Sequence, residues 1–490
     1  MPLDHFSTPP TPSIAFDNSY ARLPERFFAA QVPTPVADPQ IVRVNTALAA
    51  ELGIDPAALD AALLSGNRVA DGSTPIAQVY AGHQFGNFSP ILGDGRAVLL
   101  GEVVTQAGQR FDLQLKGAGR TAFSRSGDGR AALGPVLREY ILGEAMHGLG
   151  IPTTRALAAV TTGQPVFRET PLPGAVLTRV AASHLRVGTF QFFASQGDLE
   201  AVRVLADYAI ERHYPECAGD YPAFLRAVIR RQAELVAHWL LVGFIHGVMN
   251  TDNVSISGET IDYGPCAFMD AYDPGTVFSS IDQAGRYAYG RQPRIAGWNL
   301  ARLAEALLPL LAPEQKDGIE IAQAAISGFG ERFEAVYLAG LRRKIGLETE
   351  RDGDDDLTQA LLKHMQEGAA DFTLTFRALA DAVDGDEAPV RALFSPAAAY
   401  DAWAPAWRAR LAAEPNPGRA AAMRAVNPLY IARNHLVEAA LAAATQSGDD
   451  APFATLLEVL ARPFEAQPGR ERYALPPTVD ERVLATFCGT

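Results

Sequence analysis

One stretch of the chain constrains its fold more than any other, because it places two oxygen-bearing side chains at the ends of a short turn. Residues 244–266 read FIHGVMNTDNVSISGETIDYGPC. Apolar stretches at 254–256 and 260–261 flank a polar, glycine-bearing turn, which predicts a small hairpin. Asn253 precedes the first strand and Asp262 closes the second, so folding back brings an amide oxygen and a carboxylate together. Such a pair suits a hard divalent cation that bridges phosphates.

The spacing within this stretch is similar to that of the protein-kinase signatures. Protein kinases carry a catalytic loop H-R-D-L-x-x-x-N followed by D-F-G. Here His246 begins the loop, Asn253 ends it, and Asp262-Tyr263-Gly264 supplies the second signature. Val248 occupies the place of the kinase base, and valine cannot accept a proton. An isolated D-Y-G is usually a turn, so the prediction of a kinase-like site depends on the elements upstream.

Those upstream elements occur in the required order. A glycine-bearing hairpin is predicted between residues 78 and 104, with turn signals at Gly93 and Gly95. In the strand 111–116 apolar and polar residues alternate, which predicts Lys116 on the face opposite the core. A helix over 134–149 follows and carries Glu139 and Glu144, the candidate partners of this lysine. A solvated strand lysine is the alternative.

The length of 490 residues exceeds what one compact core usually takes, so a large two-lobed unit with an extension is expected. The predicted fold class is α+β, a protein-kinase-like two-lobed fold with an N-terminal arm and a helical C-terminal extension. The predicted parts are an arm with a helical segment that begins near Asp38 (1–75), an N-lobe (76–182), a C-lobe (183–300) and the extension (301–490). Further strands are expected over about 156–182, and helix over 201–245.

Composition excludes several classes of protein. Forty-two Lys and Arg against 56 Asp and Glu give a net charge of −14, which argues against a nucleic-acid or anionic-membrane surface. No uncharged apolar stretch approaches ~18 residues and no leader pattern is recognised, so a cytoplasmic protein is expected. The three cysteines, Cys217, Cys266 and Cys488, include no CxxC pair, which excludes a disulfide framework and disfavours a thiolate zinc site.

Several long motifs resemble those of the selenoprotein O family, protein adenylyltransferases built on a pseudokinase scaffold. The resemblance covers most of the chain and rests on specific segments: AGHQFGNFSPILGDGRAVLLGE, LQLKGAGRTAFSRSGDGRA, REYILGEAM, LGIPTTRAL, SHLRVGTFQFF, HGVMNTDNVSISGETIDYGPCAFMD and NPLYIARN.

The resemblance implies that ATP lies flipped relative to its pose in kinases, so that AMP passes to protein hydroxyls and pyrophosphate leaves. It implies Lys116 and Glu139 as an ion pair, and Asn253 and Asp262 as ligands of Mg²⁺ or Mn²⁺. Asp252 would then be the general base. From the residues alone, Asp252 is the acidic side chain nearest to Asn253, although a turn-capping aspartate is an alternative.

The resemblance also implies a nucleotide-binding set: Gly93, Gly95, Arg96, Lys116, Asp128, Gly129, Arg179, Arg186 and Asp262. Arginine offers fork-shaped donors to phosphate oxygens, but a solvated arginine or a plain turn is an alternative at each position. His83 and His184 lack partners with metal-ligand spacing and are assigned no catalytic role.

Cys488 lies where some family members carry selenocysteine, so a disulfide with Cys266 is one hypothesis, and two separate thiols are the other. The functions that remain open beside adenylylation are uridylylation with UTP, ATP-dependent phosphotransfer, and nucleotide binding without catalysis.

Overall fold

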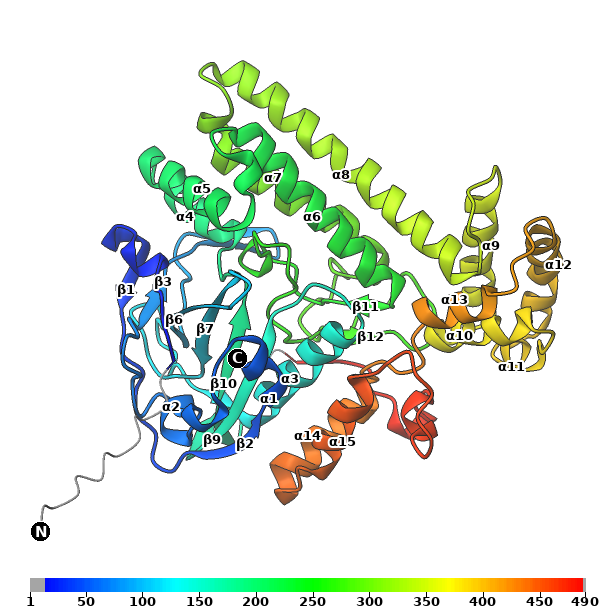
Figure 1. Cartoon of the computed structure of the whole chain (residues 1–490), viewed down its shortest axis with the longest axis horizontal. Helices are drawn as coiled ribbons and strands as arrows, with labels where there is room; N and C mark the ends of the chain where they lie inside the picture. The colour runs from blue at the N-terminus through cyan, green and yellow to red at the C-terminus, as the bar shows by residue number, and fades with distance from the viewer. Residues whose placement is uncertain (1–13, 488–490) are drawn as a thin grey trace, which may run out of the picture. The chain divides into compact units, whose positions relative to one another are not determined.

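The computed structural model describes residues 14–487, which divide into two compact units. The first unit contains residues 14–79 with Leu92–Val136 and Arg155–Ser183. The second contains Tyr80–Ile91, Leu137–Thr154 and residues 184–487. The fold is mixed: the first unit is built on an antiparallel sheet and the second is mostly helical (Figure 1).

The first unit is organised around one eight-stranded antiparallel sheet, counted over the described residues. Its strand order is β1-β3-β6-β7-β10-β9-β2, with β8 beside β10. The strands are β1 (Phe28–Ala30), β2 (Gln40–Val44), β3 (Ile76–Gln78), β6 (Ala97–Val104), β7 (Arg110–Lys116), β8 (Ala131–Ala132), β9 (Arg155–Phe167) and β10 (Pro171–Ala181). Two short helices, α1 (Thr46–Glu51) and α2 (Ala61–Ser65), belong to the same unit. Their leucines pack in one apolar cluster with residues of β7, β9 and β10.

Strand β7 is confirmed, but its polar face is not solvated as a simple alternation would suggest. Leu113 and Leu115 are buried, and so are Asp112 and Gln114 between them. Gln114 Nε2 donates to Asp94 Oδ2 at 3.2 Å, so the polar side chain is satisfied inside the unit. Lys116, at the end of the strand, is half-buried.

The N-terminal residues, from the first described one onward, belong to the first unit. Tyr20 and Phe27 are fully buried, and β1 pairs with β3. The prediction for residues 1–13 lies outside the described residues. Helical structure near Asp38 was a wrong prediction, because the β-branched run of β2 pairs with β9. The helix begins at Thr46, where the Asn45 side chain accepts from Leu48 N.

The second unit is dominated by helices, and Figure 1 shows α6, α7 and α8 side by side. The helices of this unit are α4 (Val187–Ser195), α5 (Leu199–His213), α6 (Tyr221–Leu241), α7 (Gln292–Leu311), α8 (Gln315–Lys344), α9 (Asp354–Glu367), α10 (Phe372–Val383), α11 (Ala388–Ala392), α12 (Ala398–Ala412), α13 (Arg419–Val426), α14 (Asn434–Ala442) and α15 (Ala451–Leu460). The helix α3 (Leu133–Gly148), predicted over 134–149, lies mostly in it. Two small sheets complete the unit: β4 (Gly82–Gln84) with β5 (Asn87–Ser89), and β11 (Phe244–Ile245) with β12 (Ala267–Phe268).

Helix was correctly predicted over most of 201–245, but the segment holds two helices. A 3-10 turn at Pro215–Cys217 separates α5 from α6, and Asp220 caps the start of α6. The predicted apolar stripe of α6, which includes Leu225, Val228 and Trp239, is buried. Helix α6 ends next to β11, which leads into the segment with the kinase-like spacing.

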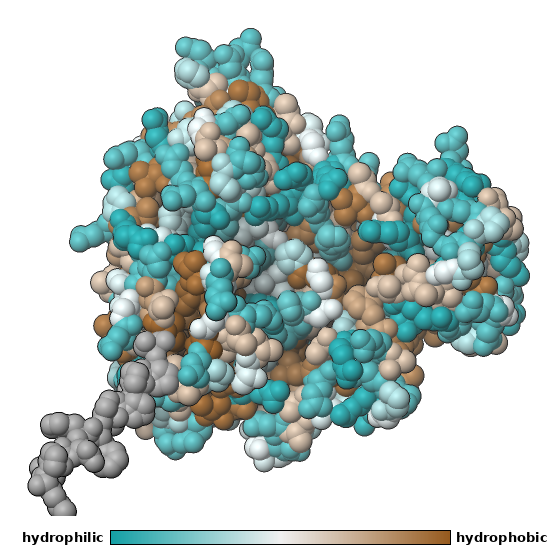
Figure 2. Space-filling view, in the orientation of Figure 1, coloured by the Kyte–Doolittle hydropathy of each residue, from teal (hydrophilic) through white to brown (hydrophobic). Residues whose placement is uncertain are grey.

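The surface is that of an ordinary mixed polar protein. Figure 2 shows hydrophilic side chains spread over the visible face, with hydrophobic ones between them. None of the helices within residues 14–487 is long and apolar enough to cross a membrane.

Candidate active site

The loop that follows β11 is fixed at its start by a buried histidine. His246 is 1% exposed, and its Nε2 donates to the Ile261 carbonyl at 2.9 Å. Its backbone N donates to Gln292 Oε1, also at 2.9 Å. Burial lowers the pKa of His246, which favours the neutral ring. His246 therefore joins the loop to the segment that carries Asp262.

The hairpin predicted over 254–261 is not present. Ser255 instead forms a bridge with Arg186, and Thr260 forms one with Thr153. The stretches on either side of Gly258 are too short to pair with each other. Their backbone N–H and C=O groups form hydrogen bonds with neighbouring segments instead. The turn itself remains, since Gly258 N donates to Ser255 O.

Arg186 ties the two halves of the segment together. Its Nη1 donates to the Asp252 carbonyl at 2.7 Å and to Asp262 Oδ2 at 2.8 Å. The guanidinium also lies 4.7 Å from the centre of the Tyr80 ring. One nitrogen atom thus brings the backbone of Asp252 and the carboxylate of Asp262 together, which the sequence spacing alone predicted through a hairpin.

The two candidate metal ligands are held in defined poses. Asp262 has φ of +65°, a left-handed conformation that is strained for a residue other than glycine and costs about 1–3 kcal/mol. Asn253 Nδ2 donates to the Val248 carbonyl at 3.0 Å, so its side-chain oxygen is the atom available to a ligand. Val248, which replaces the kinase base, thereby orients Asn253 through its backbone.

Asp252 is a buried carboxylate with incomplete hydrogen bonding. It is 7% exposed, and its Oδ1 has no hydrogen-bond partner among the described residues. Its Oδ2 accepts one long bond of 3.3 Å from Gln84 Nε2. Burial raises the pKa of Asp252 to about 6, against an opposing effect of Arg186. A carboxylate with an open acceptor atom can take a proton from a hydroxyl placed beside it.

The β4–β5 hairpin clamps this loop, and sequence reasoning missed that role. Three consecutive hairpin residues contact three consecutive loop residues: His83 N donates to Thr251 Oγ1 (2.7 Å), Gln84 Nε2 to Asp252 Oδ2 and Phe85 N to Asn250 Oδ1 (3.0 Å). At Gly82 a side chain is excluded, because a Cβ there would lie 2.4 Å from Asp252 Oδ1. The two glycines of AGHQFG were the available signal, since Gly82 allows the close approach of Asp252 and Gly86 has a φ of +87° in the turn.

His83 itself is structural in the way the sequence suggested. Its Nδ1 accepts from Gln191 Nε2 at 2.9 Å, and the Trp298 ring stands edge-on to it with centroids 5.3 Å apart. Burial lowers the pKa of His83. His184, the other histidine that was assigned no catalytic role, is also buried.

In the first unit, two of the candidate nucleotide ligands share one face of the sheet. Arg179 on β10 stands directly opposite Gln114 on β7, and Lys116 follows two residues after Gln114. Residues two apart on a strand, and cross-strand partners, point to the same face. Arg179 is 2% exposed, and its Nη1 donates to Gln114 Oε1 at 3.5 Å. Asp94, which accepts from Gln114, is a further polar residue here that the sequence pattern did not indicate.

The glycine-bearing turn before β6 packs against residues 121–124. Gly93 has φ of +66°, and a Cβ there would lie 2.3 Å from the Phe123 ring. The Gly95 carbonyl accepts from Ser124 Oγ, and the Arg96 carbonyl accepts from Gly117 N at 2.7 Å. Packing therefore accounts for Gly93 even without a nucleotide, and the binding roles of all three residues stay predictions.

Asp128 and Gly129 lie in the connection between β7 and β8. The Asp128 carboxylate forms an ion pair with Arg168 at 2.8 Å and accepts from Arg130 N at 2.9 Å. The hydrogen bond with Arg168 holds the pKa of Asp128 below its usual value. This carboxylate is therefore already engaged, and its role toward a nucleotide stays a prediction.

The proposed ion pair and disulfide also remain predictions. Glu139 is buried on α3 and belongs to the second unit, whereas Lys116 belongs to the first. Cys266 is buried, and Cys488 lies outside the described residues.

The residues around Asp262 fit a divalent cation by their chemistry. Within residues 14–487 no group of three or more His, Cys, Asp or Glu side chains could hold a metal by itself. Mg²⁺ typically keeps several waters and binds through one or two carboxylates together with substrate phosphates. The Asn253 amide oxygen and the Asp262 carboxylate match that oxygen-only ligand set.

Known proteins resemble this chain over almost its whole length. The profile of a family described as Protein adenylyltransferase SelO matches residues 10–461. A Protein nucleotidyltransferase YdiU of Rhizobium etli is 61% identical over 491 residues, covering 98% of each chain. Proteins with the same name from a Bradyrhizobium species and from Rhodopseudomonas palustris are each 62% identical, over 485 and 486 residues, and each alignment covers 97% of this chain and 99% of the relative.

Proposed function

This chain belongs to the protein adenylyltransferase SelO family and is a nucleotidyltransferase, and on that premise we propose that it transfers AMP from ATP to Ser, Thr or Tyr hydroxyls of proteins. The scaffold is a kinase-like fold with two lobes. The observation that carries the proposal is that Arg186 joins the backbone carbonyl of Asp252 to the carboxylate of Asp262. The side-chain oxygen of Asn253, the next residue, is available to a ligand.

Asp252 is the proposed general base. It accepts the proton of the acceptor hydroxyl while that oxygen attacks the α-phosphorus, and the bond between the α-phosphorus and the bridging oxygen breaks to release pyrophosphate. Its support is geometric, because Oδ1 is buried and open while Gln84 and Gly82 fix the position of the carboxylate.

Asn253 and Asp262 are the proposed ligands of Mg²⁺ or Mn²⁺. When bound, the metal neutralises charge on the phosphate oxygens and on the departing pyrophosphate. Arg186 fixes the Asp262 carboxylate, and Val248 fixes the amide of Asn253, so both ligands are oriented before a metal binds.

The remaining assignments concern ATP. We propose that Lys116, paired with Glu139, and the arginines Arg96, Arg179 and Arg186 meet its phosphates, with Gly93, Gly95, Asp128 and Gly129 contributing to the same binding. The burial of Arg179 against Gln114 supports a preorganised donor on the sheet.

The test is to supply ATP labelled on either the α or the γ phosphate with Mg²⁺ or Mn²⁺. Adenylylation predicts that the α label becomes protein-bound and the γ label is released. Retention of the γ label would establish phosphotransfer instead, and ATP binding without either transfer would establish a silent module.

A metal-ligand variant completes the test. Asp262→Ala should abolish metal-dependent transfer, whereas Asp352→Ala, at an exposed aspartate with no hydrogen-bond or ion-pair partner among the described residues, should transfer at the parent rate. Parent activity in Asp262→Ala would refute the ligand assignment.

UTP is a second candidate nucleotide donor, because the names of the relatives specify nucleotidyl transfer and do not say which nucleobase the nucleotide carries. Parallel reactions with α-labelled ATP and UTP at equal concentration compare the two directly. A faster reaction with UTP would replace adenylylation by uridylylation.

A further inference from the structure

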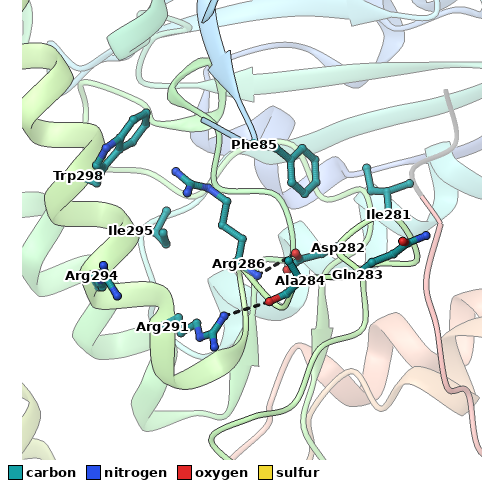
Figure 3. A pocket seen from close by; sticks show the side chains of 10 residues that line it. All are labelled: Phe85, Ile281, Asp282, Gln283, Ala284, Arg286, Arg291, Arg294, Ile295 and Trp298. Carbon is teal, nitrogen blue, oxygen red and sulfur yellow. Dashed lines mark hydrogen bonds between the residues drawn. The ribbon is translucent and has the colours of Figure 1, made fainter. Parts of the chain in front are cut away.

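A pocket with positively charged and aromatic walls lies in the second unit beside the catalytic loop. Its volume is about 730 Å³, and it is formed by Phe85 of the β4–β5 hairpin, the segment 281–286 and the first turns of α7 (Figure 3). Phe85, Ile281 and Trp298 provide apolar surface, and Arg286, Arg291 and Arg294 provide charge. None of these side chains is assigned a role in the proposed transfer, although the backbone of Phe85 belongs to the clamp on the catalytic loop.

The pocket carries a surplus of positive charge in a chain whose net charge is −14. Over the described residues, no carboxylate forms an ion pair with Arg286, Arg291 or Arg294, although many other arginines have such partners. The one acidic residue of the lining, Asp282, is 4% exposed and accepts backbone N–H groups of residues 286 and 287. The pocket therefore attracts anionic groups, whereas the net negative charge of the chain repels them elsewhere.

Arg286 is held in place by aromatic rings. Its guanidinium lies 5.0 Å from the centre of the Trp298 ring and 5.7 Å from that of Tyr287. Its Nε is buried and has no hydrogen-bond partner among residues 14–487. Figure 3 shows this side chain extending between Trp298 and Phe85. A guanidinium held by aromatic rings, with no carboxylate ion-pair partner among the described residues, suits a carboxylate ligand.

The wall of the pocket is continuous with the catalytic loop. The Phe85 and Tyr287 rings lie 5.0 Å apart, centre to centre. Phe85 N and the Tyr287 hydroxyl both donate to Asn250 Oδ1, at 3.0 and 2.7 Å. Asn250 is two residues from Asp252, the proposed base. The same loop therefore carries the proposed base and contacts the wall of the pocket.

We propose that this pocket docks an acidic segment of the acceptor protein, with Arg286 and Arg294 binding Asp or Glu side chains near the modified hydroxyl. The proposal rests on the proposed function, because it names the class of protein segment that the transfer reaction would select. Apolar walls beside the arginines favour a peptide, whose neighbouring side chains can cover Phe85, Ile281 and Trp298, over a bare inorganic anion.

The test measures binding, without nucleotide, of two fluorescein-labelled peptides by anisotropy. Both contain one serine in the same apolar context, and the flanking residues are Glu in one peptide and Gln in the other. The full-length protein should bind the Glu peptide at least about tenfold more tightly, and added salt should reduce this preference. Equal affinity for the two peptides would overturn the proposal.

Charge variants locate the binding site. Arg294→Glu and Arg286→Gln should each remove most of the preference for the Glu peptide. Glu is favourable in the first turn of a helix, so Arg294→Glu is expected to fold even if Arg286→Gln does not. Arg226→Glu makes the same charge change at an exposed position of α6 and should keep the preference. An equal loss in Arg226→Glu, or none in Arg294→Glu, would overturn the assignment.

The outcome is separable from that of the proposed function. If the wild-type protein transfers the α label but binds both peptides equally, the docking pocket is wrong and adenylylation stands. If the Glu peptide binds preferentially and no α label is transferred, the docking pocket stands and adenylylation is wrong.

Discussion

Two buried charges in the second unit, Asp252 and Arg433, are treated in opposite ways. Arg433, in the NPLYIARN motif, is fully buried and surrounded by acceptors. It donates to Asp270 at 2.5 Å, to Asp371 at 2.8 and 3.1 Å, and to the Ala474 carbonyl at 2.9 Å. Asp252 has one acceptor atom without a partner and one long hydrogen bond.

The pKa directions express the same difference. Burial by itself would lower the pKa of Arg433, but Asp371 and Asp270 outweigh it and the pKa is raised. At Asp252 burial prevails over Arg186 and raises the pKa to about 6. A buried charged side chain whose hydrogen-bonding atoms have partners stabilises the fold. A buried charged side chain with an unpartnered acceptor atom can take part in proton transfer. Replacing Asp252 by a neutral residue should therefore reduce the transfer rate, whereas replacing Arg433 by a neutral residue should reduce the free energy of unfolding.

The largest expected effect is on transfer at Asp252. Asp252→Asn should lower the rate of α-label transfer about 10²–10⁴-fold, because an amide cannot accept the proton. The free energy of unfolding should not fall, since a poorly solvated carboxylate is removed. Rates and urea unfolding are measured on the same preparations, with Asp352→Asn as the exposed control. A variant that unfolds more easily but keeps its rate per folded molecule would make Asp252 structural, like Arg433.

Arg433 should show the reverse pattern. Arg433→Leu leaves buried carboxylates without their partner and should lower the free energy of unfolding by about 3–5 kcal/mol in urea. Arg343→Leu, on an exposed arginine of α8, should change it by less than about 0.5 kcal/mol. A loss below about 1 kcal/mol in Arg433→Leu would show that these ion pairs contribute little beyond their desolvation cost.

Lys344 is a third buried titratable group, and it contacts aromatic rings in place of carboxylates. It is 4% exposed, its Nζ lies 4.4 Å from the centre of the Phe376 ring, and burial lowers its pKa to about 7. Between about pH 7 and the ordinary lysine pKa, the unfolded chain holds a proton that the folded protein releases. Stability therefore rises with pH over this window, relative to a variant without the group.

Lys344→Met should accordingly stabilise the protein, by about 1–3 kcal/mol at pH 6 and by less at pH 9. Chemical unfolding of both proteins at the two pH values measures the difference. A gain that grows from pH 6 to pH 9 would contradict the lowered pKa.

The smallest expected effect concerns the clamp on the catalytic loop. Gln84→Leu removes the one side-chain donor to Asp252 and should slow transfer by about three- to tenfold, in line with about 1 kcal/mol for such a bond. The affinity for ATP should change little. Gln323→Leu, an exposed glutamine on α8, is the matched control. A drop as large as that of Asp252→Asn would mean that Gln84 touches the reacting groups.

The parts of the fold that were predictable are those with a strong local signal. The alternation in β7, the spacing in α3 and α6, and the glycines before β6 each have a short-range cause, and the elements are present. The prediction of a small hairpin after Asn253 was wrong, because such short stretches pair with whichever backbone lies beside them. Here Ser255 pairs with Arg186, and Thr260 pairs with Thr153. That neighbour is set by packing and cannot be read from local pattern.

Residue types and their order along the chain are enough to show which chemistry is available: an asparagine and an aspartate at kinase-like spacing, a second aspartate directly before the asparagine, and no kinase base at Val248. These are properties of residue type and order. How that chemistry is arranged depends on the folded chain, because a hydrogen bond or a desolvated carboxylate involves groups that are far apart in the sequence. It left Asp252 Oδ1 without a partner beside the clamp of residues 82–85, and it placed two carboxylates and a carbonyl around Arg433.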